Sequence, residues 1–146
     1  MKPSSILETV LYATDLDTSK SFYTNVIGLD FYSEVKGRHV FFKFDHGMLL
    51  IFNPGATEVP PKAGALPVPP HGARGPGHVC FTASADEIDA WRAHLTALGI
   101  AIESEFAWPN RDPAKQGRSI YLRDPAGNSV EFAEPRIWGI KEVLSP

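Results

Sequence analysis

An internal duplication limits the folds open to this chain more than any other feature of its sequence. Residues 37–42 (GRHVFF) are echoed by residues 117–122 (GRSIYL), and each copy runs into a turn that carries a glycine, Gly47 or Gly127. Each copy is also preceded by a strand-like segment, a helix-like segment and a glycine followed by an aliphatic residue. A repeat of this kind indicates two equivalent supersecondary units.

The pattern of apolar residues assigns the same order of elements to both halves. Alternating apolar residues predict strands, and apolar residues three or four positions apart predict helices that end at Gly28 and Gly99. We therefore predict an α+β fold of two tandem βαβββ modules, which form a half-open curved sheet around a cavity. The predicted strands are 6–13, 29–35, 39–44, 48–52, 77–83, 100–107, 117–123 and 129–133, and the predicted helices are 18–26 and 86–98.

The length of 146 residues is that of a single domain. Module one covers about residues 6–53, and module two covers about residues 77–134. The connector between them, residues 54–76, holds seven of the 13 prolines, so we expect it to be extended and stiff. Connectors of this length often serve as lids over functional sites. The tail, residues 135–146, carries apolar side chains that we expect to dock on this domain or on a neighbour.

The composition excludes several classes of function. The net charge of −3 with interspersed charges argues against a nucleic-acid partner. No apolar run reaches the length of about 18 residues that a membrane span needs, and residues 1–5 lack a signal-peptide pattern. A single cysteine, Cys80, fits a reducing compartment, so we expect a cytoplasmic protein. With nucleic acid and membrane excluded, the expected partner is a small molecule.

Three potential metal ligands occupy matching places in the two modules. Glu8 and His78 each begin the first strand of a module, and Glu131 lies on the last strand of module two. Because side chains alternate along a strand, each faces away from its helix and toward the hollow side of the sheet. One imidazole and two carboxylates are able to hold a divalent ion. Taken singly, a glutamate at a strand start is more often solvated and a histidine more often structural.

Several motifs resemble those of one superfamily. Thr14-Asp15-Leu16, Ser21-Phe22-Tyr23 and Ile27-Gly28-Leu29 in the first half, and Gly77-His78-Val79 with residues 123–131 (RDPAGNSVE) in the second, are similar to segments of vicinal oxygen chelate proteins. These are the glyoxalase, bleomycin-resistance and extradiol-dioxygenase proteins. The resemblance covers roughly residues 6–134. It implies paired βαβββ modules around one divalent ion, which is Mn, Fe, Ni, Zn or Mg.

The resemblance also implies roles for the three candidates. Glu8, His78 and Glu131 would hold the metal, and Glu131, Glu8 or a bound water would move a proton. The fourth ligand of glyoxalase I is a glutamate on the last strand of the first module, where this chain offers Leu49 or Ile51, neither of which binds metal. The expected function is therefore a metal-dependent lyase or isomerase acting on a small oxygenated substrate by bidentate chelation. A ring-cleaving dioxygenase and a metal-free protein that sequesters a drug, like the bleomycin-resistance branch, are the alternatives.

Other residues are candidates for binding the substrate. Arg38 and Arg118 hold equivalent places in the repeat and suit an anionic group, although pairing with an acidic neighbour is an equal alternative. Tyr12 shares the face of Glu8 and would form a pocket wall or relay a proton, and Trp108 would line an apolar pocket or simply pack. His71 in the connector is expected to be a solvent-exposed loop residue rather than a group that closes over the metal. Uncovered sheet edges predict a homodimer. The resemblance implies one as well, because dimers are common in the family.

Overall fold

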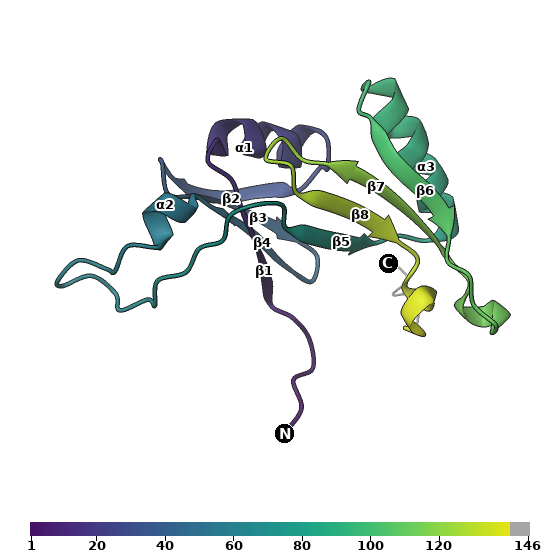
Figure 1. Cartoon of the computed structure of the whole chain (residues 1–146), viewed down its shortest axis with the longest axis horizontal. Coiled ribbons are helices and arrows are strands. Elements are labelled where there is room, and N and C mark those ends of the chain that lie inside the picture. Colours follow the sequence, from purple (N-terminus) through teal and green to yellow (C-terminus); the bar gives the residue numbers. More distant parts are fainter. Residues whose placement is uncertain (141–146) are drawn as a thin grey trace. The chain divides into compact units, whose positions relative to one another are not determined.

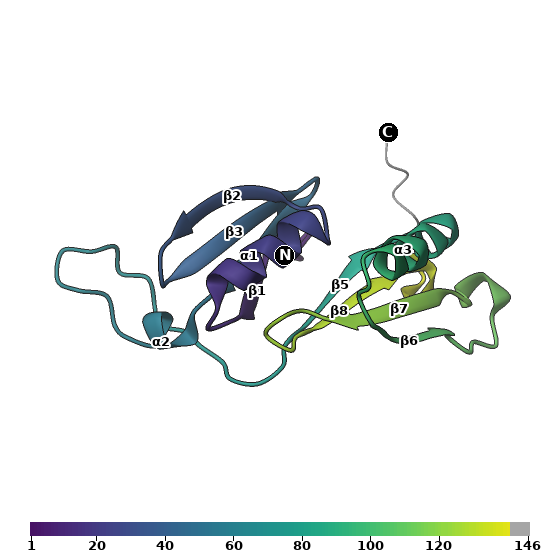
Figure 2. The same ribbon diagram turned by 90° about the horizontal axis from the view of Figure 1, so that it is seen from above.

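A computed structural model describes residues 1–140 of the chain. The chain divides into two compact units: residues 1–77 with 124–128 form unit 1, and residues 78–123 with the chain from residue 129 onward form unit 2. Each unit carries one four-stranded mixed sheet and one main helix (Figures 1 and 2). The predicted α+β class and the two βαβββ modules are confirmed.

Unit 1 is built on a sheet with strand order β1-β4-β3-β2, in which β1 and β4 are parallel and the other pairs are antiparallel. Asp15 caps helix α1 by accepting a hydrogen bond from the Thr18 amide. The helix packs Phe22 and Tyr23 against the buried side of β3 and β4. The elements are β1 (Glu8–Tyr12), α1 (Leu16–Asn25), β2 (Asp30–Val35), β3 (His39–Phe44), β4 (Gly47–Phe52) and α2 (Pro54–Thr57).

Unit 2 repeats this arrangement with strand order β5-β8-β7-β6. Ser84 and Glu87 form a capping box at the start of helix α3, and Trp91 of the helix stacks on Phe132 of β8 with ring centroids 3.9 Å apart. None of the helices within residues 1–140 has the length and apolar character that crossing a membrane requires. The elements are β5 (His78–Thr82), α3 (Ala85–Ala97), β6 (Ile102–Ala107), η1 (Pro113–Lys115), β7 (Arg118–Arg123), β8 (Ser129–Ala133) and η2 (Pro135–Trp138).

The tail begins with the short helix η2, and its apolar side chains do not share one environment. Ile137 packs on Gly117. A Cβ atom added to Gly117 would lie 2.8 Å from Ile137 Cγ2. Trp138 and Ile140 are exposed. The predicted docking of residues 141–146 lies outside the described part of the chain.

The tip of the β7–β8 hairpin, residues 124–128, belongs to unit 1 although the sequence placed it inside module two. Its carboxylate and amide are almost fully buried, with Asp124 4% and Asn128 1% exposed. Tyr23 of helix α1 donates a hydrogen bond of 2.9 Å to Asp124 Oδ2, and Asn128 Nδ2 donates one of 3.2 Å to the Tyr12 carbonyl. These buried polar contacts explain why this turn groups with unit 1.

The buried phenol of Tyr23 leads to a testable pH dependence. Burial, the charge of Asp124 and the hydrogen bond to it raise the pKa of Tyr23. Because the folded pKa exceeds the unfolded value of about 10, this contribution is complete below pH 10 and is lost as the pH rises above it. We expect the wild type to lose about 1.4 kcal/mol more unfolding free energy per pH unit above pH 10 than Tyr23→Phe. Urea denaturation at pH 9–11 measures this, and equal slopes would contradict it.

Candidate active site

The candidate site in unit 2 lies on the face of the sheet opposite helix α3. Alternation places His78 and Cys80 of β5, Glu131 of β8, and Ser119 and Tyr121 of β7 on this face. The residues between them on β7 and β8, such as Ile120 and Val130, are fully buried. The predicted orientation of His78 and Glu131 agrees with this pattern of burial.

His78 and Glu131 are in direct contact. His78 Nε2 lies 3.2 Å from Glu131 Oε2, and the Glu131 side chain is 7% exposed, whereas that of His78 is 51% exposed. The other ring nitrogen, Nδ1, lies 3.2 Å from the Ser129 carbonyl oxygen. A carbonyl only accepts hydrogen bonds, so Nδ1 carries a proton and donates it. In the neutral tautomer with a proton on Nδ1, Nε2 therefore turns its lone pair toward a carboxylate that also only accepts.

Two acceptors at this distance need a positive charge to share, which is either a proton on Nε2 or a metal cation. Two ligands with bonds of about 2.1 Å to one ion lie about 3.0–3.4 Å apart at octahedral or tetrahedral angles. The separation of 3.2 Å between Nε2 and Oε2 falls in that range. A carbonyl that accepts from the second ring nitrogen is also the usual support of a metal-binding histidine. This pair fits a divalent metal ion.

Two neighbours of Glu131 remain protonated donors at neutral pH. Cys80 and Tyr121 are its direct strand partners on β5 and β7. Burial, the charge of Glu131 and a hydrogen bond to it raise the pKa of Cys80 to about 12. Burial and then the hydrogen bond and charge of Glu131 likewise raise the pKa of Tyr121 to about 12. The thiol is therefore not an activated nucleophile, and the phenol is available as a neutral hydrogen-bond donor.

A row of aromatic rings extends from His78 across this face; we call it the aromatic row. The ring of His78 stacks on Tyr121 at 6.4 Å, and Tyr121 stacks on Phe106 at 5.7 Å. Trp108 meets Phe106 edge-on and donates a 2.8 Å hydrogen bond from Nε1 to Ser119 Oγ. Phe106 is 40% and Trp108 36% exposed, so the row presents open apolar surface beside the polar pair. Trp108, predicted to contact substrate, lies at its far end.

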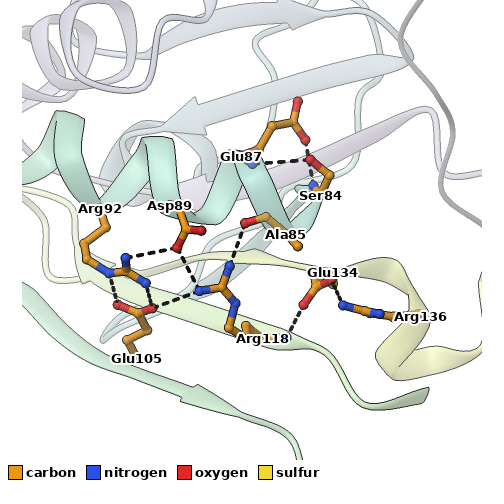
Figure 3. A network of polar contacts seen from close by, with 9 residues as sticks. All are labelled: Ser84, Ala85, Glu87, Asp89, Arg92, Glu105, Arg118, Glu134 and Arg136. Atoms are coloured by element: carbon orange, nitrogen blue, oxygen red, sulfur yellow. Dashed lines mark hydrogen bonds and ion pairs between the residues drawn. The ribbon is translucent and has the colours of Figure 1, made fainter. Parts of the chain in front are cut away.

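The structure directs Arg118 toward helix α3, on the other side of the sheet from Glu131. Its guanidinium donates to Asp89 at 2.8 Å and to the Ala85 carbonyl at 2.6 Å, and it lies 3.8 Å from Glu105 (Figure 3). The hydrogen bond and charge of Asp89 raise the pKa of Arg118. Of the two interpretations of this residue, pairing with an acidic neighbour is the one the structure displays.

In unit 1 the predicted substrate residues are tied to the connector. Arg38 donates a 2.7 Å hydrogen bond to the Ala56 carbonyl, and Tyr12 Oη lies 2.7 Å from His71 Nδ1. Burial and then the charge of Glu58 raise the pKa of Tyr12. The expectation that His71 is a solvent-exposed loop residue is wrong, because the ring is half-buried and packs edge-on against Phe52 at 4.7 Å. Its backbone amide also donates to the Thr57 carbonyl.

The strand registers identify the counterpart of Glu131 in unit 1. Glu131 pairs with Cys80 on the first strand of unit 2, and the same position in unit 1 pairs Val10 with Leu50. The counterpart is thus Leu50, not Leu49 or Ile51 as expected from the sequence, because those two side chains point into the core and are 0% exposed. Leu50 is equally unable to bind a metal, so the conclusion drawn from the sequence stands.

Glu8 is exposed at the start of β1 in unit 1, whereas His78 and Glu131 belong to unit 2. Within residues 1–140, no group of three or more His, Cys, Asp or Glu side chains is placed to hold one ion. The structure therefore brings two of the three predicted ligands together, and the participation of Glu8 stays a prediction.

Comparison with known proteins gives consistent matches in sequence and fold. A lactoylglutathione lyase from Agrobacterium tumefaciens is 42% identical, with a TM-score of 0.88 over 96% of this chain and 100% of that one. A virulence protein from Salmonella typhimurium is 27% identical, with a TM-score of 0.67 over 92% of this chain and 98% of that one. An integron cassette protein from Vibrio cholerae is 26% identical, with a TM-score of 0.68 over 92% and 97% of the two chains.

A search of curated proteins gave no significant match. The model of one family matches residues 5–132, which is most of the chain. The match spans both predicted modules and includes His78 and Glu131. The chain belongs to the Glyoxalase/Bleomycin resistance protein/Dioxygenase superfamily.

Proposed function

We propose that this chain is a metal-dependent lyase or isomerase of the glyoxalase type. The observation that carries the proposal is the contact of His78 Nε2 with Glu131 Oε2, whose separation of 3.2 Å suits two ligands of one divalent ion. The name of the 42% identical structure, a lactoylglutathione lyase, supports a lyase. Glu8 is proposed as the third ligand on the strength of its place in the repeat.

The proposed substrate is a small molecule with oxygen atoms on adjacent carbons. A divalent ion held by His78 and Glu131 would supply Lewis acidity, which polarises a bound carbonyl group. Glu131 is the proposed base for a proton on the neighbouring carbon, and the neutral phenol of Tyr121 is placed to donate a hydrogen bond beside it. Leu50 stands where glyoxalase I supplies a further carboxylate, so the substrate need not be a glutathione adduct.

Metal analysis tests this proposal. We expect protein purified without added ion to bind one Mn²⁺, Fe²⁺, Ni²⁺, Zn²⁺ or Mg²⁺ per chain, and His78→Ala to weaken that binding about 100-fold because an inner-shell ligand is lost. His46→Ala, in an exposed turn of unit 1, is the matched control and should bind like the wild type. Isothermal titration with each ion measures the affinities. Wild-type protein that binds none of them would refute the proposal.

One observation favours a second function, the sequestration of an aromatic drug. The aromatic row includes two partly exposed rings, Phe106 and Trp108, against which a planar molecule would pack. This function predicts drug binding that is unaffected by a chelator or by His78→Ala but weakened by Phe106→Ala. Phe31→Ala, which alters an exposed phenylalanine on the edge strand β2 of unit 1, is the matched control.

We also propose that the protein works as a homodimer. The edge strand β2 leaves Phe31 44%, Tyr32 65% and Val35 50% exposed, and apolar edges of this kind are usually covered. Light scattering after gel filtration should give twice the chain mass of 16.0 kDa. A mass of one chain at micromolar concentration would contradict this.

A further inference from the structure

The side chain of Asn128 has no role in the chemistry proposed above, yet it is among the most buried polar groups of the chain. It is 1% exposed and sits at the end of the turn formed by residues 124–128. Its amide bonds two other segments of the chain and its own turn. Oδ1 accepts from the Gly77 amide at 2.7 Å, and Nδ2 donates to the Tyr12 carbonyl at 3.2 Å and to Asp124 Oδ2 at 2.8 Å.

Two of the segments that meet at Asn128, at Gly77 and at Asn128 itself, lead directly into strands of the candidate site. Gly77 immediately precedes His78, and Asn128 immediately precedes Ser129, the strand partner of His78. The bond from Gly77 to Asn128 Oδ1 therefore joins backbone to side chain one residue before the first pair of the β5–β8 ladder. Ser129 then supplies the carbonyl that orients the His78 ring, and Glu131 follows two residues later.

The approach of Gly77 to this amide leaves no room for a side chain. A Cβ atom on Gly77 would lie 3.1 Å from Asn128 Oδ1 and 2.9 Å from Leu11 Cδ2. Backbone packed this closely against a buried, fully bonded amide has little freedom to shift. The start of β5 is consequently held at a fixed distance from the start of β8.

We propose that Asn128 is a positioning residue, which fixes the backbone at Gly77 and so sets His78 against Glu131. Its consequence for metal binding rests on the function proposed above, whereas its effect on the β5–β8 ladder does not. No other common side chain reproduces the arrangement. Aspartate would turn an acceptor toward the Tyr12 carbonyl and the Asp124 carboxylate, and alanine would leave the Gly77 amide without its acceptor.

The test compares Asn128→Ala with Tyr23→Phe. The second variant removes the hydrogen bond from Tyr23 to Asp124 in the same buried network but leaves all three contacts of Asn128 in place. We expect Asn128→Ala to speed amide hydrogen exchange at residues 77–80 at least tenfold more than Tyr23→Phe does. We also expect it to weaken Mn²⁺ binding about tenfold, the lower end of the range for residues that orient metal ligands, with Tyr23→Phe within threefold of the wild type. Exchange at residues 39–44 of unit 1 serves as the internal reference for global opening.

Each outcome decides the matter. Equal exchange at residues 77–80 in the two variants would overturn the inference, since Asn128 would then contribute only to general stability. If the wild type binds no Mn²⁺ or other divalent ion, the proposed function fails, and the exchange rates alone decide the positioning role. Should Asn128→Ala not fold, Asn128→Ser replaces it, because a serine hydroxyl is too short to reach the Gly77 amide but keeps the site polar.

Discussion

Replacing Glu131 with glutamine is expected to abolish tight binding of a divalent ion while leaving the fold intact. The substitution keeps the shape of the side chain but removes the charge that the cation shares with His78. We expect the affinity for the ion to fall more than 100-fold and turnover to be lost with it. The stability of the metal-free protein should change by less than about 1 kcal/mol, because a nearly buried charge is replaced by a neutral group of equal size.

The same variant has a readout that needs no metal. The charge of Glu131 contributes to raising the pKa of Tyr121 to about 12, so Glu131→Gln should lower that pKa toward the ordinary value of about 10, with burial still holding it above that value. Ultraviolet titration of the wild type and the variant measures the difference. Glu103→Gln, which alters an exposed ion pair with Arg123, is the matched control and should leave Tyr121 unchanged. An unchanged titration in Glu131→Gln would show that the carboxylate does not face the phenol.

The fold was predictable because the same pattern of strand-forming and helix-forming segments occurs in both halves of the sequence. Alternation in β3 and β7 and the glycines that end the helices act over a few residues, so they can be identified from the sequence. The assignment of residues 124–128 to unit 1 could not be predicted in this way. It depends on Tyr23 meeting Asp124 across 101 positions of the chain, a contact that leaves no local pattern.

The site was predictable to the extent that the alternation of side chains along a strand determines which residues share a face. Alternation placed His78 and Glu131 on one face, and the structure places them 3.2 Å apart. Alternation alone did not identify Leu50 as the counterpart of Glu131, because that requires the register between two strands. The half-buried position of His71 depends on how the connector folds back on Tyr12, which proline content does not predict.

The largest loss of stability is expected from Asp124→Ala. The carboxylate is 4% exposed and accepts four hydrogen bonds: Oδ1 from the amides of Ala126 and Asn128, and Oδ2 from Tyr23 Oη and Asn128 Nδ2. Its removal leaves a buried hydroxyl and a buried amide without an acceptor, and each such group costs about 1–3 kcal/mol. We therefore expect the free energy of unfolding to fall by about 3–5 kcal/mol.

The repeat supplies a matched control for this variant. Asp45 stands in the turn between β3 and β4, the counterpart of the turn that holds Asp124, but it is exposed. Asp45→Ala should therefore change the unfolding free energy by less than about 0.5 kcal/mol. Guanidinium denaturation measures both, and thermal unfolding should show Asp124→Ala melting about 6–20 °C below the wild type. Equal losses in the two variants would mean that the buried network around Asp124 contributes nothing beyond an ordinary turn.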